Sequence, residues 1–285
     1  MDSSILRFLQ HLGDQEGAAD NTLIAYSTDL DQFQRVVLAH GDQPELLSAL
    51  NRENVRHYAE WLGQQGYQPA TVSRKMAAVR SFLGYIGAYA PMPARHLTAL
   101  LNAPPSPQRK PLTLTKSELQ RLLNAPKSRT TPGALRDAAI LSVLYETGFR
   151  AHEMVTLQIS DLDLERATIQ RPGAPDSQLG VRDSIQDLTT YLKSGRPHFL
   201  KHLAERTLFL NQRGKGLSRQ GLWLVVKRWA NEAGLRSDLS PQTLRHTRAQ
   251  NLLGQGYKRG EVQRLLGLSS PNALRIHRPS DDKEK

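Results

Sequence analysis

The sequence of 285 residues contains no cysteine, and this absence excludes disulfide bonds and thiolate metal sites. A chain without cysteine also fits a reducing compartment. Nine histidines are present, but none has a spacing typical of a metal site, such as His-Glu-x-x-His. We therefore expect a protein that holds neither a metal ion nor a cofactor.

Long hydrophobic runs are also absent, because the chain has no stretch of about eighteen apolar residues, the length that suggests a membrane-spanning helix. Residues 1–15 lack the basic start and the apolar centre of a secretory signal. With 39% apolar and 23% charged residues, the composition is that of a globular protein. These features predict a cytoplasmic protein with no membrane partner, long enough for one large domain or two ordinary ones.

Acidic residues are outnumbered by basic ones only outside the N-terminal third of the chain. The sequence carries 38 Lys and Arg against 27 Asp and Glu, a formal net charge of +11. Residues 1–105 hold 8 basic and 10 acidic residues, whereas the other 180 residues hold 30 and 17. An excess of this size suggests a polyanionic partner, usually nucleic acid, and a ribosome-associated or merely basic protein is the alternative. The excess of positive charge lies in the C-terminal part of the chain.

Apolar residues recur at helical spacing through the first ninety residues. Asp20-Asn21-Thr22 supplies a helix N-cap, and Pro69 comes just before the last of these apolar patterns. Four amphipathic helices of this length form a compact bundle. The four patterns lie at residues 5–12, 23–33, 55–62 and 72–86.

A proline-rich stretch at residues 104–111 predicts a linker, because proline stiffens the chain and removes backbone donors. We therefore expect a helical domain at residues 1–103, a second domain at residues 112–278 and a charged tail at residues 279–285. The linker separates the acidic part of the chain from most of the basic part.

The second domain is predicted to be mainly helical with a small β-hairpin. Thr115 and Glu118 form a capping-box pattern, and Gly148 ends a strongly apolar helix. Two short strand candidates, residues 167–170 and 180–182, flank a segment rich in proline and glycine. Further helices are expected at residues 184–194, 218–233, 240–254 and 259–266.

Arg245 lies on the face of a predicted helix that also carries Ala249 and Leu252. An arginine on a core-facing apolar stripe is costly unless it meets an anion. One interpretation is a buried pair with a carboxylate. The other is a phosphate site, because guanidinium offers a planar fork that matches two phosphate oxygens.

Arg150 follows the helix stop at Gly148 and opens a new helix. A cation at a helix N-terminus opposes the helix dipole, so another interaction must favour it. A bound anion would supply that interaction, and a solvated surface position is the alternative.

The two arginines belong to a series of short motifs. These are Thr71-Val-Ser-Arg74-Lys75, Thr147-Gly-Phe-Arg150-Ala-His-Glu153, Asn211-Gln-Arg-Gly214, Leu217-Ser-Arg-Gln220, Leu244-Arg245-His246-Thr247 and Leu266-Gly267 with Ser269-Ser270. In this order and spacing they resemble the motifs of the tyrosine recombinases, the phage integrase family, and the resemblance covers residues 4–278. It implies a four-helix core-binding bundle of the Xer type, a mainly helical catalytic domain with a small β-hairpin, double-stranded DNA as the ligand, and a recombinase partner subunit in an assembled complex.

The family's mechanism implies six groups around the scissile phosphate: two arginines, two histidine-type donors, a hairpin lysine as general acid and a tyrosine nucleophile. Arg150 and Arg245 match the two arginines. Three of the other four catalytic positions carry residues that depart from the family's pattern. Gln242 stands where His or Lys is expected, Leu268 where His or Trp is usual, and His277 where the tyrosine would stand.

The hairpin lysine is missing as well, because no lysine occurs between Lys127 and Lys193. Arg166, Arg171 and Arg182 lie near the hairpin, but arginine is a poor proton donor, with a pKa above about 12. Each lost donor in such a site typically costs about 10²–10³ in rate, and loss of the tyrosine removes the covalent route. The pattern predicts phosphate binding without strand cleavage.

We therefore expect a DNA-binding pseudoenzyme at the nucleoid, acting as a regulator, a DNA-architectural protein or a recombination accessory. Two alternatives stay open. One is an active site-specific recombinase whose chemistry is unusual or completed by a partner subunit. The other is a protein-interaction module on a recombinase scaffold, which the acidic N-terminal part favours. The candidate phosphate contacts are Arg74, Lys75, Arg80, Lys215, Arg219, Lys227, Arg228 and Arg248.

Overall fold

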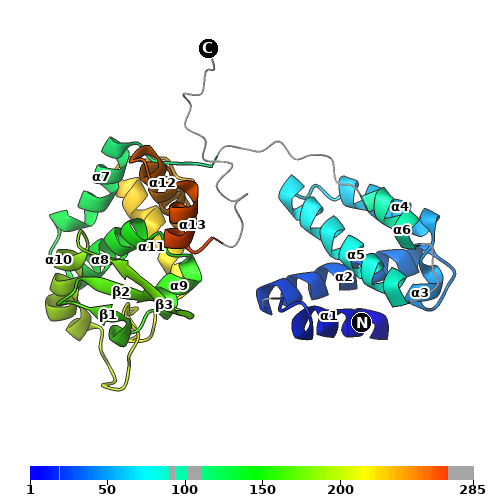
Figure 1. Ribbon diagram of the computed structural model, residues 1–285, viewed down its shortest axis with the longest axis horizontal. Helices are drawn as coiled ribbons and strands as arrows, with labels where there is room; N and C mark the ends of the chain where they lie inside the picture. The colour runs from blue at the N-terminus through cyan, green and yellow to red at the C-terminus, as the bar shows by residue number, and fades with distance from the viewer. Residues whose placement is uncertain (19, 90–93, 102–110, 269–285) are drawn as a thin grey trace, which may run out of the picture. The chain divides into compact units, whose positions relative to one another are not determined.

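The chain forms two compact units, Met1–Pro107 and Gln108–Lys285, each with its own hydrophobic core (Figure 1). The structure, a computed structural model, describes residues 1–18, 20–89, 94–101 and 111–268. Most of the predicted linker and all of the predicted tail lie outside these residues, as does His277.

The described residues of the first unit contain helices and no strand, and its four long helices confirm the predicted bundle. Two short helices, α3 (Leu46–Ala49) and α6 (Ala94–Thr98), were not predicted. Aromatic rings fill the centre, where Phe33 and Tyr58 pack edge to face with centroids 4.9 Å apart. The long helices are α1 (Ser3–Asp14), α2 (Asp20–His40), α4 (Arg52–Gln64) and α5 (Pro69–Tyr89).

The second unit is mainly helical, as predicted, and α8 forms its centre. The capping box at Thr115 is present, because Glu118 Oε2 accepts from the Thr115 amide while Thr115 Oγ1 accepts from the Glu118 amide. Its principal helices are α7 (Lys116–Asn124), α8 (Pro132–Thr147), α9 (Ala151–Thr156), α10 (Ile185–Thr190), α11 (Arg219–Glu232), α12 (Pro241–Gly254) and α13 (Arg259–Leu266).

A three-stranded antiparallel sheet, ordered β1-β2-β3, lies in the second unit and contains the predicted hairpin. Its strands are β1 (Leu162–Asp163), β2 (Thr168–Arg171) and β3 (Ala174–Gly180). The hairpin turn passes through Gly173, whose φ of 75° favours glycine. Burial alternates along β2, so that Ile169 and Arg171 point inward. The strand β3 begins six residues earlier than predicted, and β1 was not predicted.

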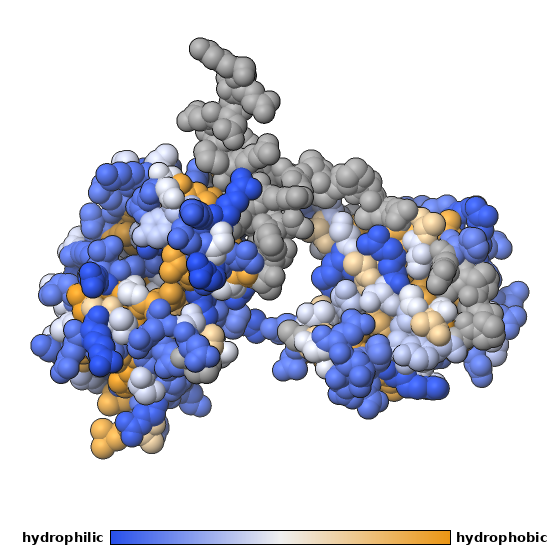
Figure 2. Space-filling model, viewed as in Figure 1, coloured by the Kyte–Doolittle hydropathy of each residue, from blue (hydrophilic) through white to orange (hydrophobic). Residues whose placement is uncertain are grey.

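The face of each unit seen in Figure 2 is mostly hydrophilic, and its apolar residues form separate patches. Within the described parts of the chain, no helix is long and apolar enough to cross a lipid bilayer. Most of the large apolar side chains in the described residues are buried in the cores of the two units.

Candidate functional site

The link between α8 and α9 forms one wall of the candidate site. Gly148 ends α8 in the left-handed conformation, with φ of 60°, and its amide bonds to the carbonyl of Leu144. A Cβ at this position would overlap the side chain of Leu266, so both conformation and space require glycine. This turn places Arg150 two residues beyond Gly148, the C-cap of the buried helix α8.

Arg245 lies on α12 and is buried, with only 4% of its surface exposed. Its Nη1 donates to the carbonyl oxygen of Gly148, while its Nη2 is buried and has no hydrogen-bond partner in the described structure. Burial and the nearby charge of Arg150 lower the pKa of the Arg245 guanidinium to about 10. No carboxylate forms an ion pair with it among the described residues, so the interpretation as a structural Arg–carboxylate pair is not supported.

Arg150 is held from two sides. Its Nη2 donates to the carbonyl of Gly267, and its Nη1 donates to Glu153 Oε1 at 3.2 Å. The second oxygen of the Glu153 carboxylate accepts from the Arg150 backbone amide. The Arg150 side chain nevertheless keeps 37% of its surface exposed, which makes it accessible to a ligand.

A third arginine, which the sequence did not identify as a site residue, completes the cluster. Arg171 at the end of β2 is buried and donates through Nη1 to Glu153 Oε1 at 2.9 Å. Its Nη2 donates to the carbonyl of Leu265 at 2.7 Å, and its guanidinium lies 5.0 Å from the ring centre of Phe149. The inward position could have been predicted from the alternation of β2, in which Ile169 is the apolar inward residue.

These four side chains carry a formal charge of +2, because three guanidinium groups are accompanied by one carboxylate, that of Glu153, which pairs with Arg150 and Arg171. Arg245, Arg150 and Arg171 are close enough for their charges to influence one another. An excess of buried positive charge is unfavourable unless an anion compensates it. The cluster is therefore suited to an anion with several oxygens, such as a phosphate group.

The departures from the expected catalytic set have their own positions. Gln242 is exposed on α12, and its Nε2 lies 3.2 Å from His246 Nε2. Leu268 packs against the small apolar cluster of α12 and α13, and its amide bonds to the Gln263 carbonyl. Neither side chain supplies an ionisable group. Within the described residues, no group of three or more His, Asp or Glu could hold a metal ion.

The predicted phosphate contacts of the second unit differ in their surroundings. Lys215, Arg219 and Lys227 are exposed, and Lys227 Nζ lies 4.4 Å from the ring centre of Trp223. Arg228 is also exposed but forms an ion pair with Glu232 on the same helix. Arg248 stacks its guanidinium over the ring of Tyr145 at 5.6 Å, and its Nε is buried without a partner in the described structure.

Two of the three predicted contacts of the first unit, Arg74 and Lys75, pair with a buried carboxylate. Asp29 is fully buried and accepts from Lys75 Nζ at 2.9 Å and from Arg74 Nη1. Lys75 is itself buried and also donates to Gln32 at 2.7 Å. Arg74 is half exposed and Arg80 is exposed. The ammonium of Lys75 therefore serves the interior of the bundle.

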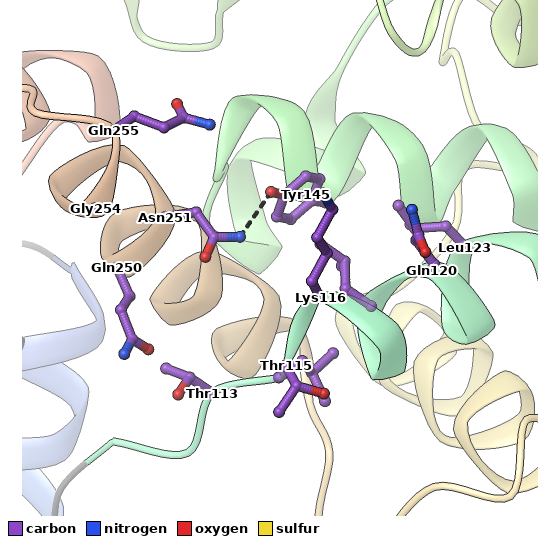
Figure 3. Close-up of a pocket in the computed structure, with 12 residues that line it drawn as sticks. Thr113, Thr115, Lys116, Gln120, Leu123, Tyr145, Gln250, Asn251, Gly254 and Gln255 are labelled. Atoms are coloured by element: carbon purple, nitrogen blue, oxygen red, sulfur yellow. Dashed lines mark hydrogen bonds between the residues drawn. The ribbon is translucent and has the colours of Figure 1, made fainter.

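A separate cavity of about 750 Å³ lies among α7, α8 and the C-terminal half of α12 (Figure 3). Asn251 and Tyr145 point toward one another across it, and Asn251 Nδ2 donates to the Tyr145 hydroxyl at 2.9 Å. The lining consists of leucines, amides, hydroxyls and one cation, Lys116. We take the arginine cluster as the candidate site, because the described lining of the cavity lacks charged groups that converge on one ligand.

Comparison with known sequences gives matches over both units. Residues 113–284 match the model of the phage integrase family, and residues 5–87 match the phage integrase N-terminal SAM-like domain. The chain is 34% identical to tyrosine recombinase XerC of Herpetosiphon aurantiacus, over 97% of this chain and 90% of that protein. It is 30% identical to tyrosine recombinase XerD of Halalkalibacterium halodurans, over 97% and 93%.

Solved structures with a similar fold include XerH site-specific recombinase bound to its difH substrate. The TM-score is 0.70 at 22% identity, over 98% of this chain and 82% of that one. The integrase of transposon Tn1549, in complex with transposon right end DNA, gives a TM-score of 0.74 at 15% identity, over 97% and 95%. At these identities the likeness concerns the fold.

Proposed function

Because the chain belongs to the phage integrase family, the tyrosine recombinases, we propose that it binds double-stranded DNA through one backbone phosphate held by Arg150 and Arg245, without cleaving the strand. The observation that carries this proposal is the buried Nη2 of Arg245, which has no partner in the described structure. A phosphate oxygen at that position would accept a charge-assisted hydrogen bond and neutralise a buried cation. The similar structures solved in complex with DNA are consistent with this ligand.

The electrostatics of the site favour a phosphodiester over a neutral ligand. A formal charge of +2 in a partly dehydrated cluster attracts an anion more strongly than the same charge in water. Because the two arginines would contact the phosphate backbone of the DNA and not the bases, this contact carries no information about the base sequence. Binding should weaken steeply with salt, because DNA releases counterions when the protein binds and the entropy gained by this release falls as the salt concentration rises.

Strand cleavage would require a nucleophile and an acid that protonates the leaving oxygen. Gln242 and Leu268 can do neither, and Arg171 is committed to Glu153 and to a backbone carbonyl. The nucleophile position is His277, and the family's tyrosine chemistry is not available to histidine. We propose that the chain retains the binding step of the family and acts as a regulator, a DNA-architectural protein or a recombination accessory on cellular DNA.

Exposed cations would position the duplex on each unit. In the second unit we assign this role to Lys215, Arg219 and Lys227, with weaker contributions from Arg228 and Arg248, which have other partners. In the first unit, residues 1–103, we assign it to Arg80 and the exposed part of Arg74. Lys75 then acts indirectly, by fixing α5 against α2.

A second candidate function is an active site-specific recombinase. It is favoured by relatives named recombinases that are 30–35% identical over 97% of this chain. In that case a partner subunit would complete the chemistry. The two candidates differ in one measurable product, a covalent protein–DNA adduct.

The experiment incubates the full chain with random duplexes and with nicked suicide duplexes, followed by native and denaturing gels at low and high salt. A salt-sensitive native shift without an adduct is the expected result. An adduct that survives denaturation would overturn the proposal in favour of the recombinase. The absence of any shift at low salt would favour the protein-interaction module.

Two variants test whether the mobility shift in the native gel depends on the arginine cluster. Arg245→Gln should weaken binding at least tenfold, because it removes the buried fork. Arg236→Gln removes the same charge from an exposed arginine of the second unit, paired with Asp238, and should change binding less than threefold. Equal effects of the two variants would contradict a specific phosphate site.

A further inference from the structure

Arg171 makes more interactions in the cluster than either arginine predicted from the sequence. It contacts Glu153, the carbonyl of Leu265 at the end of α13, and the ring of Phe149. A Cβ on Gly267 would lie 3.1 Å from its guanidinium carbon, so α13 ends directly against it. Yet Arg171 is only 5% exposed, so its role is exerted mainly on its neighbours.

The neighbour that matters is Glu153, because one of its oxygens serves two arginines. Oε1 accepts from Arg171 at 2.9 Å and from Arg150 at 3.2 Å. A carboxylate divided between two cations neutralises neither of them completely. If Arg171 were absent, the whole carboxylate charge would be available to Arg150.

We propose that Arg171 is a positioning residue that takes up the charge of Glu153 and so leaves the positive charge of Arg150 available to a phosphate. The inference rests on the proposed function, since it concerns the same phosphate site. It assigns a role to an arginine on the β-hairpin, the element on which the family's general-acid lysine would be expected. Arg171 supplies positive charge from that hairpin but turns it inward, toward Glu153.

A purely structural role is the competing explanation, because Arg171 also ties β2 to the end of α13 through Leu265. Both explanations predict that Arg171→Gln weakens phosphate binding. They differ for the double variant Arg171→Gln with Glu153→Gln. The formal charge of the cluster is +2 in the natural chain, +1 in Arg171→Gln and again +2 in the double variant.

The test measures the affinity of the full-length variants for a random duplex at low salt. We expect Arg171→Gln to bind about tenfold more weakly, the effect of one strong charge contact. The double variant should return to within about threefold of the natural chain, although it still lacks the bond to Leu265. A double variant as weak as Arg171→Gln, or weaker, would overturn the proposal. A control pair at the turn between β1 and β2 is Arg166→Gln with and without Asp163→Asn, an exposed ion pair that should show no such rescue.

A second readout uses inorganic phosphate as the probe. Phosphate at constant ionic strength should raise the melting temperature of the natural chain and the double variant more than that of Arg171→Gln. The same melts report whether each variant folds. If phosphate follows this order but no duplex binds, the proposed function fails and the role of Arg171 stands. If the duplex binds but neither probe shows the rescue, the role of Arg171 fails. If the natural chain responds to neither probe, both are overturned.

Discussion

Lys75 in the first unit and Arg245 in the second are both buried cations, and their surroundings are opposite. Lys75 in the first unit is 6% exposed and pairs with Asp29, Gln32 and the face of Tyr67. Arg245 in the second unit is 4% exposed but has one carbonyl partner and a second nitrogen with none in the described structure. Burial alone therefore does not identify a binding residue. The informative feature is a buried charged donor whose partner is missing among the described residues.

The two surroundings imply opposite responses to substitution. A cation that is already paired stabilises its own domain, and removal of its partner leaves an uncompensated buried charge. A cation that awaits an anion destabilises the unliganded domain, and its removal should increase stability while function is lost. The predictions below test this contrast.

The largest effect is expected for Asp29→Asn. It leaves Lys75 buried without a carboxylate, which typically costs about 3–5 kcal/mol. Hydrogen exchange of the α2 and α5 amides would report the loss within the first unit. Asp31→Asn on the same helix is the control, since its exposed pair with Arg35 should contribute less than about 0.5 kcal/mol. Comparable losses for both variants would show that Asp29 and Lys75 do not form a structural pair.

The next effect concerns Arg245→Gln in the unliganded protein. This change removes a dehydrated positive charge beside Arg150 and should raise the free energy of unfolding of the second unit by about 1–3 kcal/mol. Denaturant unfolding without phosphate or DNA measures the change. A loss of stability would mean that Arg245 is a structural residue like Lys75.

The pKa of Arg245 gives a third and smaller effect. Below about pH 10 the guanidinium is charged in both the folded and the unfolded chain, so the penalty of its burial is fully present. As the pH rises above about 10, the folded chain releases the proton first and the unfolded chain binds more protons. Stability then rises with pH, by at most about 1.4 kcal/mol per unit. The stability advantage of Arg245→Gln should therefore shrink between pH 9 and pH 11, roughly.

Comparison of Arg245→Gln with the natural chain at each pH isolates the contribution of Arg245, because the lysines and tyrosines titrate in both proteins. A difference in the free energy of unfolding that stays constant up to about pH 11 would contradict the lowered pKa. Saturating phosphate should abolish the trend, since a bound anion favours the charged guanidinium.

How far the sequence predicts this molecule depends on the range of the interactions involved. Local signals located α12 and α13 to within a residue, because Ser240-Pro241 and Gly267 mark helix ends. They located β3 less well, because its pairing with β2 shifts in register at Arg171, which a single strand does not indicate.

The site shows the same limit. Motif spacing predicted Arg150 and Arg245 as site residues, but the contact between Glu153 and Arg171 joins residues 18 positions apart. For Lys75 the sequence suggested a phosphate contact, since nothing local indicates that Asp29, 46 residues away, would take its charge. Long-range pairing of charges is the property that one sequence does not reveal.

The smallest effect is expected for a cation that is exposed. Lys215 lies outside the arginine cluster and near the start of α11, and its loss should weaken duplex binding by only about two- to fivefold. The measurement that identifies a phosphate contact of Lys215 is the salt dependence of duplex binding. If Lys215 contacts a phosphate, Lys215→Gln should reduce the slope of log K against log salt by about one. Lys75→Met should leave that slope unchanged in preparations that remain folded, because its charge is already held by Asp29. A reduced slope for Lys75→Met would show that the buried pair opens to meet DNA, and the contrast between the two buried cations would then fail.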